Sequence, residues 1–385
     1  MDFELPHELR LLKEQLRHFV DTEIIPTERD AYEGPSLKLE VKKRLECTAK
    51  EMGLWLIDTP PEYGGLGLSL LARVIIWEEM GRTIAFPSRK AHVFGPEISP
   101  ILFQLNERQK KDYLFPVIAG EKIACFAQTE PDAGSDPTMM RATAIRDGDD
   151  YIINGYKRFI TNAQSAHFCQ LFASTDRSKG GRGISAFLVD MDQPGVKITR
   201  IMKTIMDDEP CEIAFDDVRV PGWKRIGEEG DGFRLGQQWL TVGRLRLGAR
   251  SLGVMERCLE MSAKYAKQRV TFGQPLASRQ AIQWMLVDSY QDLVQLRLLI
   301  HQAAWRFDQG EDVRYEAYIA KNLGNRLSFK AADNAMQIHG GIAFTPELPI
   351  EKFWRDQRSL MISDGPEEVL KVALARHVFE LYGGK

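Results

Sequence analysis

The spacing of hydrophobic residues changes twice along the chain. From residue 7 to about 120 it has the period of an α-helix, as in Leu9, Leu12 and Leu16 on one face. Between about 121 and 235 hydrophobic and polar residues alternate, as in DYIINGYKRFIT, and turn residues end each run. After Gly232 the helical period returns and continues almost to the end of the chain. The order is therefore helices, then strands, then helices.

This segregation predicts an α+β multidomain protein and argues against alternating βαβ units with a parallel sheet. We expect an N-terminal α-helical domain at residues 1–120, a middle antiparallel β domain or small barrel at 121–235, and a C-terminal helical bundle at 236–385. A seam of apolar residues on one long helix supports the bundle, and its members are Leu286, Leu293, Leu296, Ile300 and Ala303.

Composition narrows the class of protein without naming a partner. A formal net charge of -3 over 385 residues gives no general attraction to nucleic acid or to an anionic membrane. No apolar run approaches the roughly 18 residues of a membrane span, and the first residues lack the apolar core of a signal peptide. Five cysteines occur singly, so we expect no metal site and reduced, mostly buried thiols. These features favour the cytoplasm, or an organelle matrix for a processed chain.

The first candidate ligand site lies in CFAQTEPDAGSDP, at residues 125–137. In its loop, Gly134, Ser135 and Asp136 can present backbone N–H groups to an anion such as a pyrophosphate. Farther along, Phe159 and Thr161 are two residues apart in NGYKRFITNA, which predicts that they share one strand face beside a flat ring with polar edges. For the loop alone, a tight turn held by Asp and Ser side chains is the favoured explanation. For the strand, the alternative is that Phe159 is a core residue and Thr161 a β-branched filler.

Two further motifs lie at predicted helix ends. KQRVTFG places Arg269 near Phe272, and QIHGG places Gln337 before Gly341. Each motif alone is explained by the end of a helix. His339 has no carboxylate or second histidine at ligand spacing, which favours a structural role.

The segment ISDGPEEVLK, at residues 362–371, has two interpretations. Asp364 is a favoured N-cap residue, and Glu367 three positions later gives the spacing of a capping box. The apolar face of the helix would begin with Val369, Leu370, Val372 and Leu374. Alternatively, the Asp364 carboxylate takes a proton from a substrate. The local sequence favours the cap.

Five motifs in one order resemble the flavoprotein acyl-CoA dehydrogenase family over nearly the whole chain: TEPDAGSD, NGYKRFITNA, RVTFG, QIHGG and WRDQRSLMISDGPEEV. The resemblance implies an N-terminal helical domain, a middle β domain and a C-terminal four-helix bundle, in agreement with the three periods. It also implies FAD as cofactor, an acyl-CoA as substrate and an electron-transfer flavoprotein as electron acceptor. The implied assembly is a homotetramer, a dimer of dimers, with a role in the catabolism of fatty or carboxylic acids.

The resemblance also assigns residues to sites. Those that would line the flavin and its pyrophosphate are Phe126, Gln128, Thr129, Gly134, Ser135, Phe159 and Thr161. Those that would complete the flavin site of a neighbouring subunit are Arg269, Phe272, Gln280, Gln337 and Gly341. Pro366 and Glu368 occupy positions that lie near the cofactor in the family, and Ser135, Arg244 and Gly365 are assigned to the substrate.

The implied reaction is α,β-dehydrogenation, in which a carboxylate removes the α-proton and the β-hydrogen leaves as hydride. Asp364 occupies the position of the family's usual glutamate base, in a sequence where Ser363 and Pro366 also depart from the common pattern. A second base position, used by some relatives, aligns with Gly243, which has no carboxylate. Asp364 is therefore the candidate base, as in a divergent branch similar to the acyl-CoA dehydrogenase 10 and 11 group. Two alternatives stay open: a nitroalkane-oxidase-like flavoenzyme with an Asp base, and a scaffold without flavin.

Overall fold

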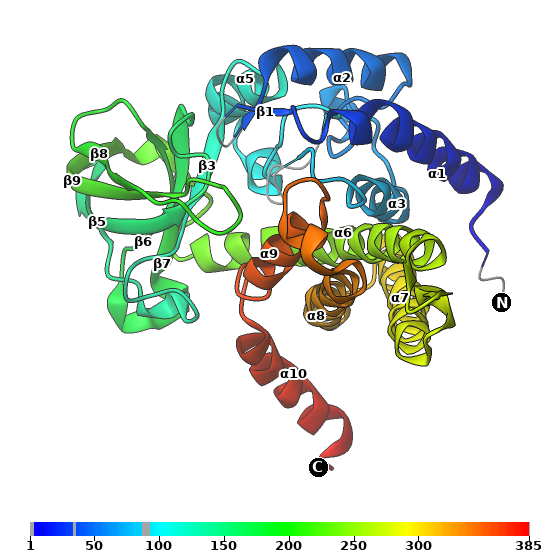
Figure 1. Cartoon of the computed structure of the whole chain (residues 1–385). Helices are drawn as coiled ribbons and strands as arrows, with labels where there is room; N and C mark the ends of the chain where they lie inside the picture. Colours follow the sequence, from blue (N-terminus) through cyan, green and yellow to red (C-terminus); the bar gives the residue numbers. More distant parts are fainter. Residues whose placement is uncertain (1–3, 34–35, 87–92, 385) are drawn as a thin grey trace. The chain divides into compact units, whose positions relative to one another are not determined.

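The computed structural model describes residues 4–33, 36–86 and 93–384 (Figure 1). The chain forms two compact units, one made of Met1–Phe94 with Thr241–Lys385 and the other of Gly95–Leu240. We call them the helical unit and the β unit. The first and third predicted domains thus fall in one compact unit, and the division into three domains stays a prediction.

The β unit carries one eight-stranded sheet. Its strands are β3 (Ala124–Ala127), β4 (Thr143–Asp147), β5 (Asp150–Ile160), β6 (Phe168–Ser174), β7 (Ile184–Asp190), β8 (Val196–Ile201), β9 (Cys211–Pro221) and β10 (Arg225–Ile226). Their order is β10-β7-β6-β4-β5-β9-β8, with β3 paired to β6. The pairs are antiparallel except for β3 with β6 and one residue pair between β4 and β6. The predicted middle β domain is therefore present.

The strand sequences explain which part of the sheet is buried. β6 (FCQLFAS) is buried along its whole length and β7 (ISAFLVD) along all but its last residue, as their continuous apolar sequences require. β5 instead alternates between buried and partly exposed positions over its first half, as its alternating sequence predicts. Two short helices, α4 (Glu107–Gln109) and α5 (Phe115–Ile118), precede the sheet in the same unit.

The helical unit contains the long helices. They are α1 (His7–Phe19), α2 (Leu39–Glu51), α3 (Leu70–Met80), α7 (Gln280–Asp308), α8 (Arg314–His339), α9 (Ile350–Leu360) and α10 (Glu367–Tyr382). The longest helix, α6 (Gly232–Gln268), begins in the β unit and continues through the helical unit. Two short hairpins complete the unit, β1 (Tyr32–Glu33) with β2 (Ser36–Leu37) and β11 (Val270–Thr271) with β12 (Gln274–Pro275).

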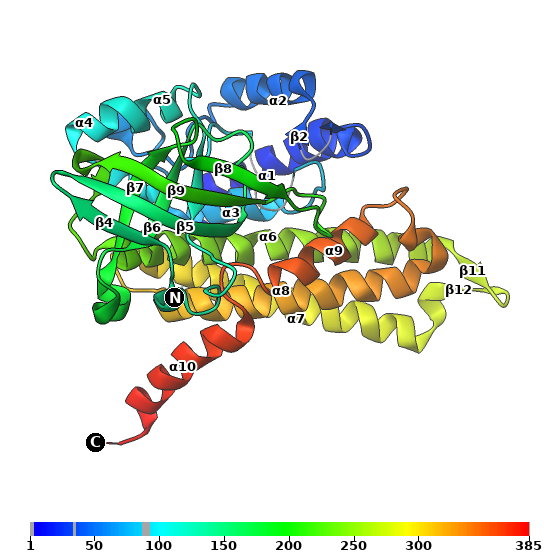
Figure 2. The same ribbon diagram turned by 90° about the vertical axis from the view of Figure 1, so that its left-hand side faces the viewer.

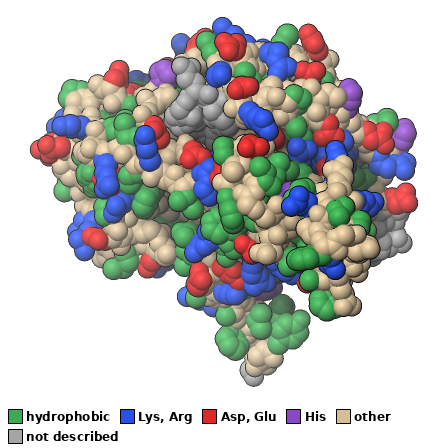
Figure 3. All heavy atoms as spheres, in the orientation of Figure 1, with side chains coloured by type: hydrophobic (Ala, Val, Ile, Leu, Met, Phe, Trp, Pro, Cys, Tyr) green, Lys and Arg blue, Asp and Glu red, His purple; other side chains and the backbone are tan. Residues whose placement is uncertain are grey.

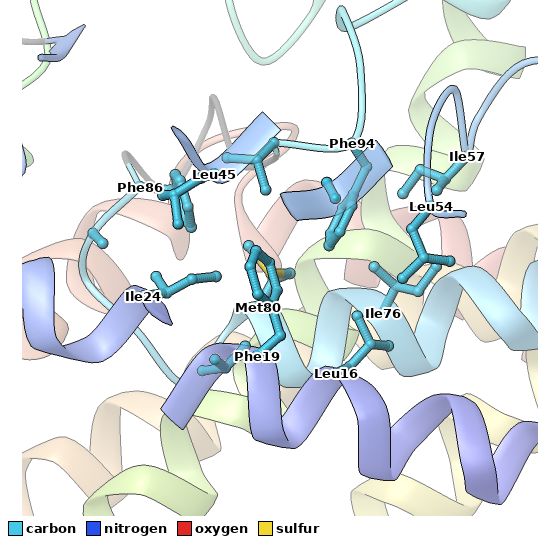
Figure 4. Close-up of a cluster of buried hydrophobic side chains, with 14 of the residues drawn as sticks. Leu16, Phe19, Ile24, Leu45, Leu54, Ile57, Ile76, Met80, Phe86 and Phe94 are labelled. Atoms are coloured by element: carbon cyan, nitrogen blue, oxygen red, sulfur yellow. The ribbon is translucent and has the colours of Figure 1, made fainter. Parts of the chain in front are cut away.

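The N-terminal helices enclose a core of their own. Figure 4 shows Leu16 and Phe19 of α1, Leu45 of α2, and Ile76 and Met80 of α3 directed toward one another, and all five are buried. Helix α3 is buried on nearly every side, because its other face packs in a second apolar cluster with α6, α7 and α8. One continuous packing therefore joins the N-terminal helices to the bundle.

Two glycines allow α3 and α6 to approach closely. A Cβ on Gly81, directly after α3, would lie 2.2 Å from the carbonyl oxygen of Arg250. A Cβ on Gly253 in α6 would lie 2.0 Å from the carbonyl oxygen of Glu78. Any side chain at either position would force the two helices apart.

The apolar seam on α7 is confirmed in part, and the apolar residues predicted for the start of α10 lie in that helix with unequal burial. Leu293, Leu296, Ile300 and Ala303 are buried, whereas Leu286 is half-buried. In α10, Leu370 is the buried residue. Both ribbon views show α10 leading away from the bundle (Figures 1 and 2), and its apolar residues Val372, Val378, Phe379 and Leu381 are exposed.

The thiol prediction holds. Four cysteines are buried, Cys47 is exposed, and all five are free. Within the described residues, no helix has both the length and the hydropathy needed to cross a membrane. The same part of the chain contains no group of three or more His, Cys, Asp and Glu side chains suited to a metal ion.

Candidate functional site

In the β unit, the predicted flavin residues lie at the ends of β3 and β5, where a buried lysine fixes the backbone. The ammonium group of Lys157 on β5 donates to the carbonyl oxygen of Gln128 at 3.0 Å and to the Glu130 carboxylate at 2.8 Å. Glu130 also accepts the backbone N–H groups of Arg141 and Ala142 at 2.6 and 3.0 Å. Burial lowers the pKa of Lys157 to about 8, and the charge of Glu130 opposes this shift. This ion pair sets the course of residues 128–130.

The loop after Glu130 matches the predicted anion site. Gly134, Ser135 and Asp136 are exposed, and their backbone N–H groups have no hydrogen-bond acceptor among the described residues. The Asp136 side chain is occupied, because its Oδ1 accepts the backbone N–H of Thr138 at 2.9 Å. Consecutive N–H groups without protein acceptors can bind the oxygens of a phosphate.

The prediction that Phe159 and Thr161 share one strand face is wrong. The pairing of β5 with β9 shifts register between Lys157 and Ile160, and Phe159 has a left-handed backbone with φ +58°. The strand ends at Ile160, so Thr161 lies in the following turn. The irregularity cancels the two-residue alternation on which the prediction depended.

The same irregularity leaves the Phe159 ring available to a ligand. Its side chain is 51% exposed, and the nearby Asn162 also has a left-handed backbone, with φ +66°. The Asn162 Oδ1 is buried without a hydrogen-bond partner among the described residues. Non-glycine residues in this conformation cost about 1–3 kcal/mol each and cluster at ligand sites. An exposed aromatic ring beside an unsatisfied buried acceptor suits a flat, polar-edged ligand.

Aromatic packing accounts for Phe126. Its ring stacks on Trp239 in the first turns of α6, with centroids 4.5 Å apart, and lies 4.7 Å from Phe172. Gln128 lies beside the same helix, since a Cβ on Gly236 would be 3.3 Å from its Oε1. Sequence reasoning missed Trp239 and Lys157. An inward-facing lysine in an alternating strand is the signal that would have identified Lys157.

In the helical unit, Asp364 lies in the loop of residues 361–366 between α9 and α10, which we call the base loop. The predicted N-cap role is wrong, because Pro366 occupies the N-cap and no side chain caps α10. Asp364 has a left-handed backbone with φ +55°, followed by Gly365 with φ +99°. Glu367 is the first helical residue and bonds Lys371 at 2.6 Å, so the predicted capping box is absent.

Two buried cations bind the backbone of the base loop. Lys321 on α8 donates to the carbonyl oxygens of Met361 at 3.1 Å and Gly365 at 2.6 Å. Arg244 on α6, predicted near the base or the CoA, donates from Nε to the carbonyl oxygen of Asp364 at 3.1 Å. The Asp364 carboxylate itself accepts no hydrogen bond from any described residue and is half-buried. The loop is thus fixed through its backbone while the carboxylate stays available.

Burial shapes the electrostatics of this cluster. It lowers the pKa of Lys321 to about 8, against the attraction of the Asp364 charge. It also lowers the pKa of Arg244, against the influence of Tyr318 and Asp364. The Arg244 guanidinium lies 4.9 Å from the centroid of the Tyr318 ring. Sequence reasoning missed Lys321 and Tyr318.

The residues predicted to face a neighbouring subunit are all exposed: Arg269, Phe272, Gln280, Gln337 and Gly341. Phe272, 97% exposed, lies in the β11–β12 hairpin at one end of the bundle (Figure 2). Tyr265 near the end of α6 stacks on His339 at the end of α8, with centroids 4.5 Å apart. This stacking brings the ends of the two helices, and so both motifs, to the same end of the bundle.

The remaining predicted residues occupy the start of α10 and its surroundings. Pro366 is half-buried at the N-cap, and Glu368 is exposed in the first turn. Gly365 is tightly enclosed, since a Cβ there would lie 3.2 Å from Leu370 and 3.5 Å from the Arg244 Nη2. His339 has the structural role predicted for it, with its Nδ1 2.8 Å from the carbonyl oxygen of Ala335.

Comparison with known proteins follows the same division of the chain. Models of the acyl-CoA dehydrogenase N-terminal, middle and C-terminal domains match residues 6–121, 125–218 and 230–379. The short-chain specific acyl-CoA dehydrogenase of Rattus norvegicus mitochondria is 34% identical over 382 residues, which cover 98% of this chain and 92% of the relative. The acryloyl-CoA reductase (NADH) of Anaerotignum propionicum is 32% identical, with coverage of 99% and 96%.

Solved structures agree in fold over almost the whole length. Butyryl-CoA dehydrogenase from Megasphaera elsdenii is 29% identical with a TM-score of 0.87, and the match covers 98% of this chain and 100% of that one. PigA, whose structure is an FAD complex, is 27% identical with a TM-score of 0.88 and coverage of 98% and 99%. The resemblance drawn from the five motifs is confirmed: the chain belongs to the acyl-CoA dehydrogenase family, whose members are FAD flavoproteins.

Proposed function

We propose that the protein is an FAD-dependent dehydrogenase that converts an acyl-CoA thioester to the 2-enoyl-CoA, with Asp364 as the acceptor of the α-proton. One observation carries the assignment of the base. The backbone carbonyl of Asp364 is bound by Arg244, whereas its carboxylate accepts no hydrogen bond from any described residue. A general base needs both a fixed position and a free oxygen for the incoming proton. Family membership supports the class of reaction.

The residues of the β unit fit the cofactor that this reaction needs. Backbone N–H groups of Gly134, Ser135 and Asp136, which lack protein acceptors, would hold the pyrophosphate of FAD. The exposed ring of Phe159 and the buried Asn162 Oδ1 would border the flavin ring. When bound, FAD would supply the acceptor for the β-hydrogen, which leaves as hydride.

The chain itself must manage the proton and the charge on the thioester. Asp364 takes the α-proton onto its carboxylate, and hydrogen-bond donors must stabilise the negative charge that develops on the thioester oxygen. The side chain is one methylene shorter than that of a glutamate, so its position depends closely on the base loop. Lys321 and Arg244 bind three backbone carbonyl oxygens of that loop.

The assembly and the electron acceptor are also part of the proposal. We infer a homotetramer, built as a dimer of dimers, in which Arg269, Phe272 and Gln337 of one subunit contact the flavin of its neighbour. Their exposure at one end of the bundle supports this role. An electron-transfer flavoprotein would then reoxidise the reduced enzyme.

Replacement of Asp364 by asparagine tests the proposal directly. Asp364→Asn removes the base and keeps the size of the side chain, so the variant should retain FAD and its visible absorbance. Acyl-CoA added without oxygen should bleach the flavin of the wild type and leave that of the variant unchanged. A panel of straight, branched, aromatic and hydroxylated acyl-CoAs gives the substrate class in the same titration.

Other outcomes would point elsewhere. Bleaching of Asp364→Asn at the wild-type rate would remove Asp364 from the mechanism. Oxygen consumption with nitroethane, together with no bleaching by any acyl-CoA, would favour a nitroalkane-oxidase-like activity. A colourless protein that binds no added FAD would favour the scaffold alternative.

A further inference from the structure

Lys321 differs from the other buried lysines of the described chain, Lys157 and Lys352. Lys157 pairs with Glu130 at 2.8 Å, and Lys352 pairs with Asp356 one turn along α9. Lys321 is as buried as Lys157, at 0% exposure, yet it forms no ion pair with any described residue. A buried ammonium without a carboxylate partner is costly. Its hydrogen-bond partners are instead two backbone carbonyl oxygens, those of Met361 and Gly365.

Those two carbonyl groups lie on either side of Asp364. Met361 and Gly365 are four residues apart, and both turn their oxygens to the Lys321 ammonium, at 3.1 and 2.6 Å. Arg244 binds the carbonyl between them, that of Asp364, at 3.1 Å. Three carbonyl groups of the base loop therefore bind cations that belong to two different helices. The base loop therefore contacts Lys321 of α8 through two carbonyl groups and Arg244 of α6 through a third.

This arrangement accounts for the unfavourable backbone of the loop. Asp364 has φ +55°, a conformation that costs a non-glycine residue about 1–3 kcal/mol unless its surroundings impose it. The Asp364 carboxylate forms no hydrogen bond with any described residue and attracts Lys321 and Arg244 through its charge alone, so it makes no directed contact that would fix this conformation. The backbone contacts must therefore do so, and the direction of the carboxylate follows from them.

We propose that Lys321 is a positioning residue for the proposed base: by binding the carbonyl oxygens of Met361 and Gly365, its ammonium sets the direction of the Asp364 carboxylate. This inference rests on the proposed function of Asp364. Lys321 touches neither substrate nor cofactor in this role, and it acts through the loop. A misplacement of about 1 Å at a reacting group can cost about 10²-fold in rate.

Lys321→Met tests the inference because it removes the ammonium and keeps an unbranched side chain of similar length. We expect kcat to fall about 10²-fold, while KM for the acyl-CoA and the FAD content stay at wild-type values. A purely structural role would instead lower the yield, the FAD content and the melting temperature, and leave kcat per bound FAD unchanged. That second outcome would overturn the inference.

Two control variants on α8 test whether loss of a lysine charge, or loss of stability alone, would also lower kcat. Lys330→Met removes an exposed lysine, which pairs with Asp292 at 3.0 Å, and should leave kcat unchanged. Asn325→Ala removes the bond from Nδ2 to the carbonyl oxygen of Leu360, 2.8 Å long and just outside the base loop. It should lower the melting temperature and keep kcat. An equal fall of kcat in Asn325→Ala would show that the end of α9, and not Lys321, controls the loop.

Lys321→Gln is the second variant to measure, in case Lys321→Met does not fold. If Lys321→Met gives no folded flavoprotein, Lys321→Gln keeps an N–H donor without the charge and should still lower kcat. Wild-type kcat in Lys321→Gln would overturn the inference.

If Asp364→Asn still bleaches with acyl-CoA, the proposed function fails. If Asp364→Asn loses bleaching while Lys321→Met keeps its kcat, only the inference about Lys321 fails.

Discussion

At the scale of single residues, the base loop shows how backbone contacts can hold the loop that carries the proposed base. Asp364 and Gly365 both have positive φ angles, of +55° and +99°. The αL conformation is accessible to Asp more often than to most residues, and it is accessible to Gly at no steric cost. The pair Asp-Gly therefore suits this turn, which explains the sequence of the loop independently of any role as a helix cap.

Alanine at Gly365 and at Gly243 should have opposite effects on stability. Gly365→Ala places a Cβ 3.2 Å from Leu370 in a strained backbone, so it should lower the melting temperature and reduce kcat. Gly243→Ala lies inside α6, where a Cβ meets no atom within 4 Å, and alanine should stabilise the helix by about 0.5–1 kcal/mol. Thermal unfolding of both variants measures this contrast. Stabilisation by Gly365→Ala would contradict the strained conformation of the loop.

The sequence pointed to Asp364 and Arg244 as candidates but not to Lys321. Motif order was enough to place the carboxylate, and the arginine lies in a recognisable stretch of the same family. Lys321 lies on a helical face with Ala317, Gly324 and Ser328, all buried. A lysine on such a small-residue face is a visible signal, but its partners are backbone carbonyls 40 and 44 residues away. The pattern of side chains along a sequence does not show which backbone carbonyl groups a side chain will bind.

At the scale of elements, the register shift in β5 decides the shape of the candidate flavin site. Alternation of hydrophobic and polar residues predicted the strand itself. It could not predict the shift between Lys157 and Ile160, because one irregular residue leaves the alternation on either side intact. Phe159 and Thr161 are two residues apart in the sequence, but in the structure they do not lie on the same face of a strand.

Lys157 should control both the stability of the β unit and its retention of FAD. Lys157→Met leaves the Glu130 carboxylate buried without its partner, which typically costs about 3–5 kcal/mol. It also releases the carbonyl of Gln128 in the candidate flavin site. We expect a lower melting temperature and loss of flavin absorbance on gel filtration.

A second substitution separates these two effects. Glu130→Gln in the Lys157→Met background removes the unpaired charge and keeps an oxygen for the backbone N–H groups of Arg141 and Ala142. The double variant should therefore recover part of the melting temperature. Recovery of neither stability nor FAD would show that the unpaired Glu130 charge is not what destabilises Lys157→Met.

At the scale of the whole molecule, two apolar surfaces of the helical unit lack a partner within the described chain. One is on α10, where Val372, Val378, Phe379, Leu381 and Tyr382 are exposed. Figure 3 shows hydrophobic side chains over this projecting helix. The other, which we call the α7 stripe, consists of Trp284, Val287, Val294, Leu298 and Trp305. The sequence predicted the helices α7 and α10, but no described residue of this chain covers their exposed apolar surfaces.

The spacing of the α7 stripe favours contact with another helix. Its members recur at intervals of three, seven, four and seven residues, which keeps them on one side of the helix. The buried seam of α7 lies on a different side, so the helix is apolar on two faces. A helix of this kind is expected between two layers, one from its own subunit and one from another.

Leu298→Glu should therefore dissociate the proposed tetramer. Leu298 is 50% exposed in the middle of the α7 stripe, and a carboxylate there would be buried without a partner in any contact between copies. Sedimentation velocity should show a smaller species than the wild type at equal concentration. Ile145→Glu, an equivalent change at a 64% exposed residue of β4, is the control and should sediment as the wild type does. If Leu298→Glu also sediments as the wild type, the α7 stripe is not an interface between subunits, and α10 becomes the surface to test.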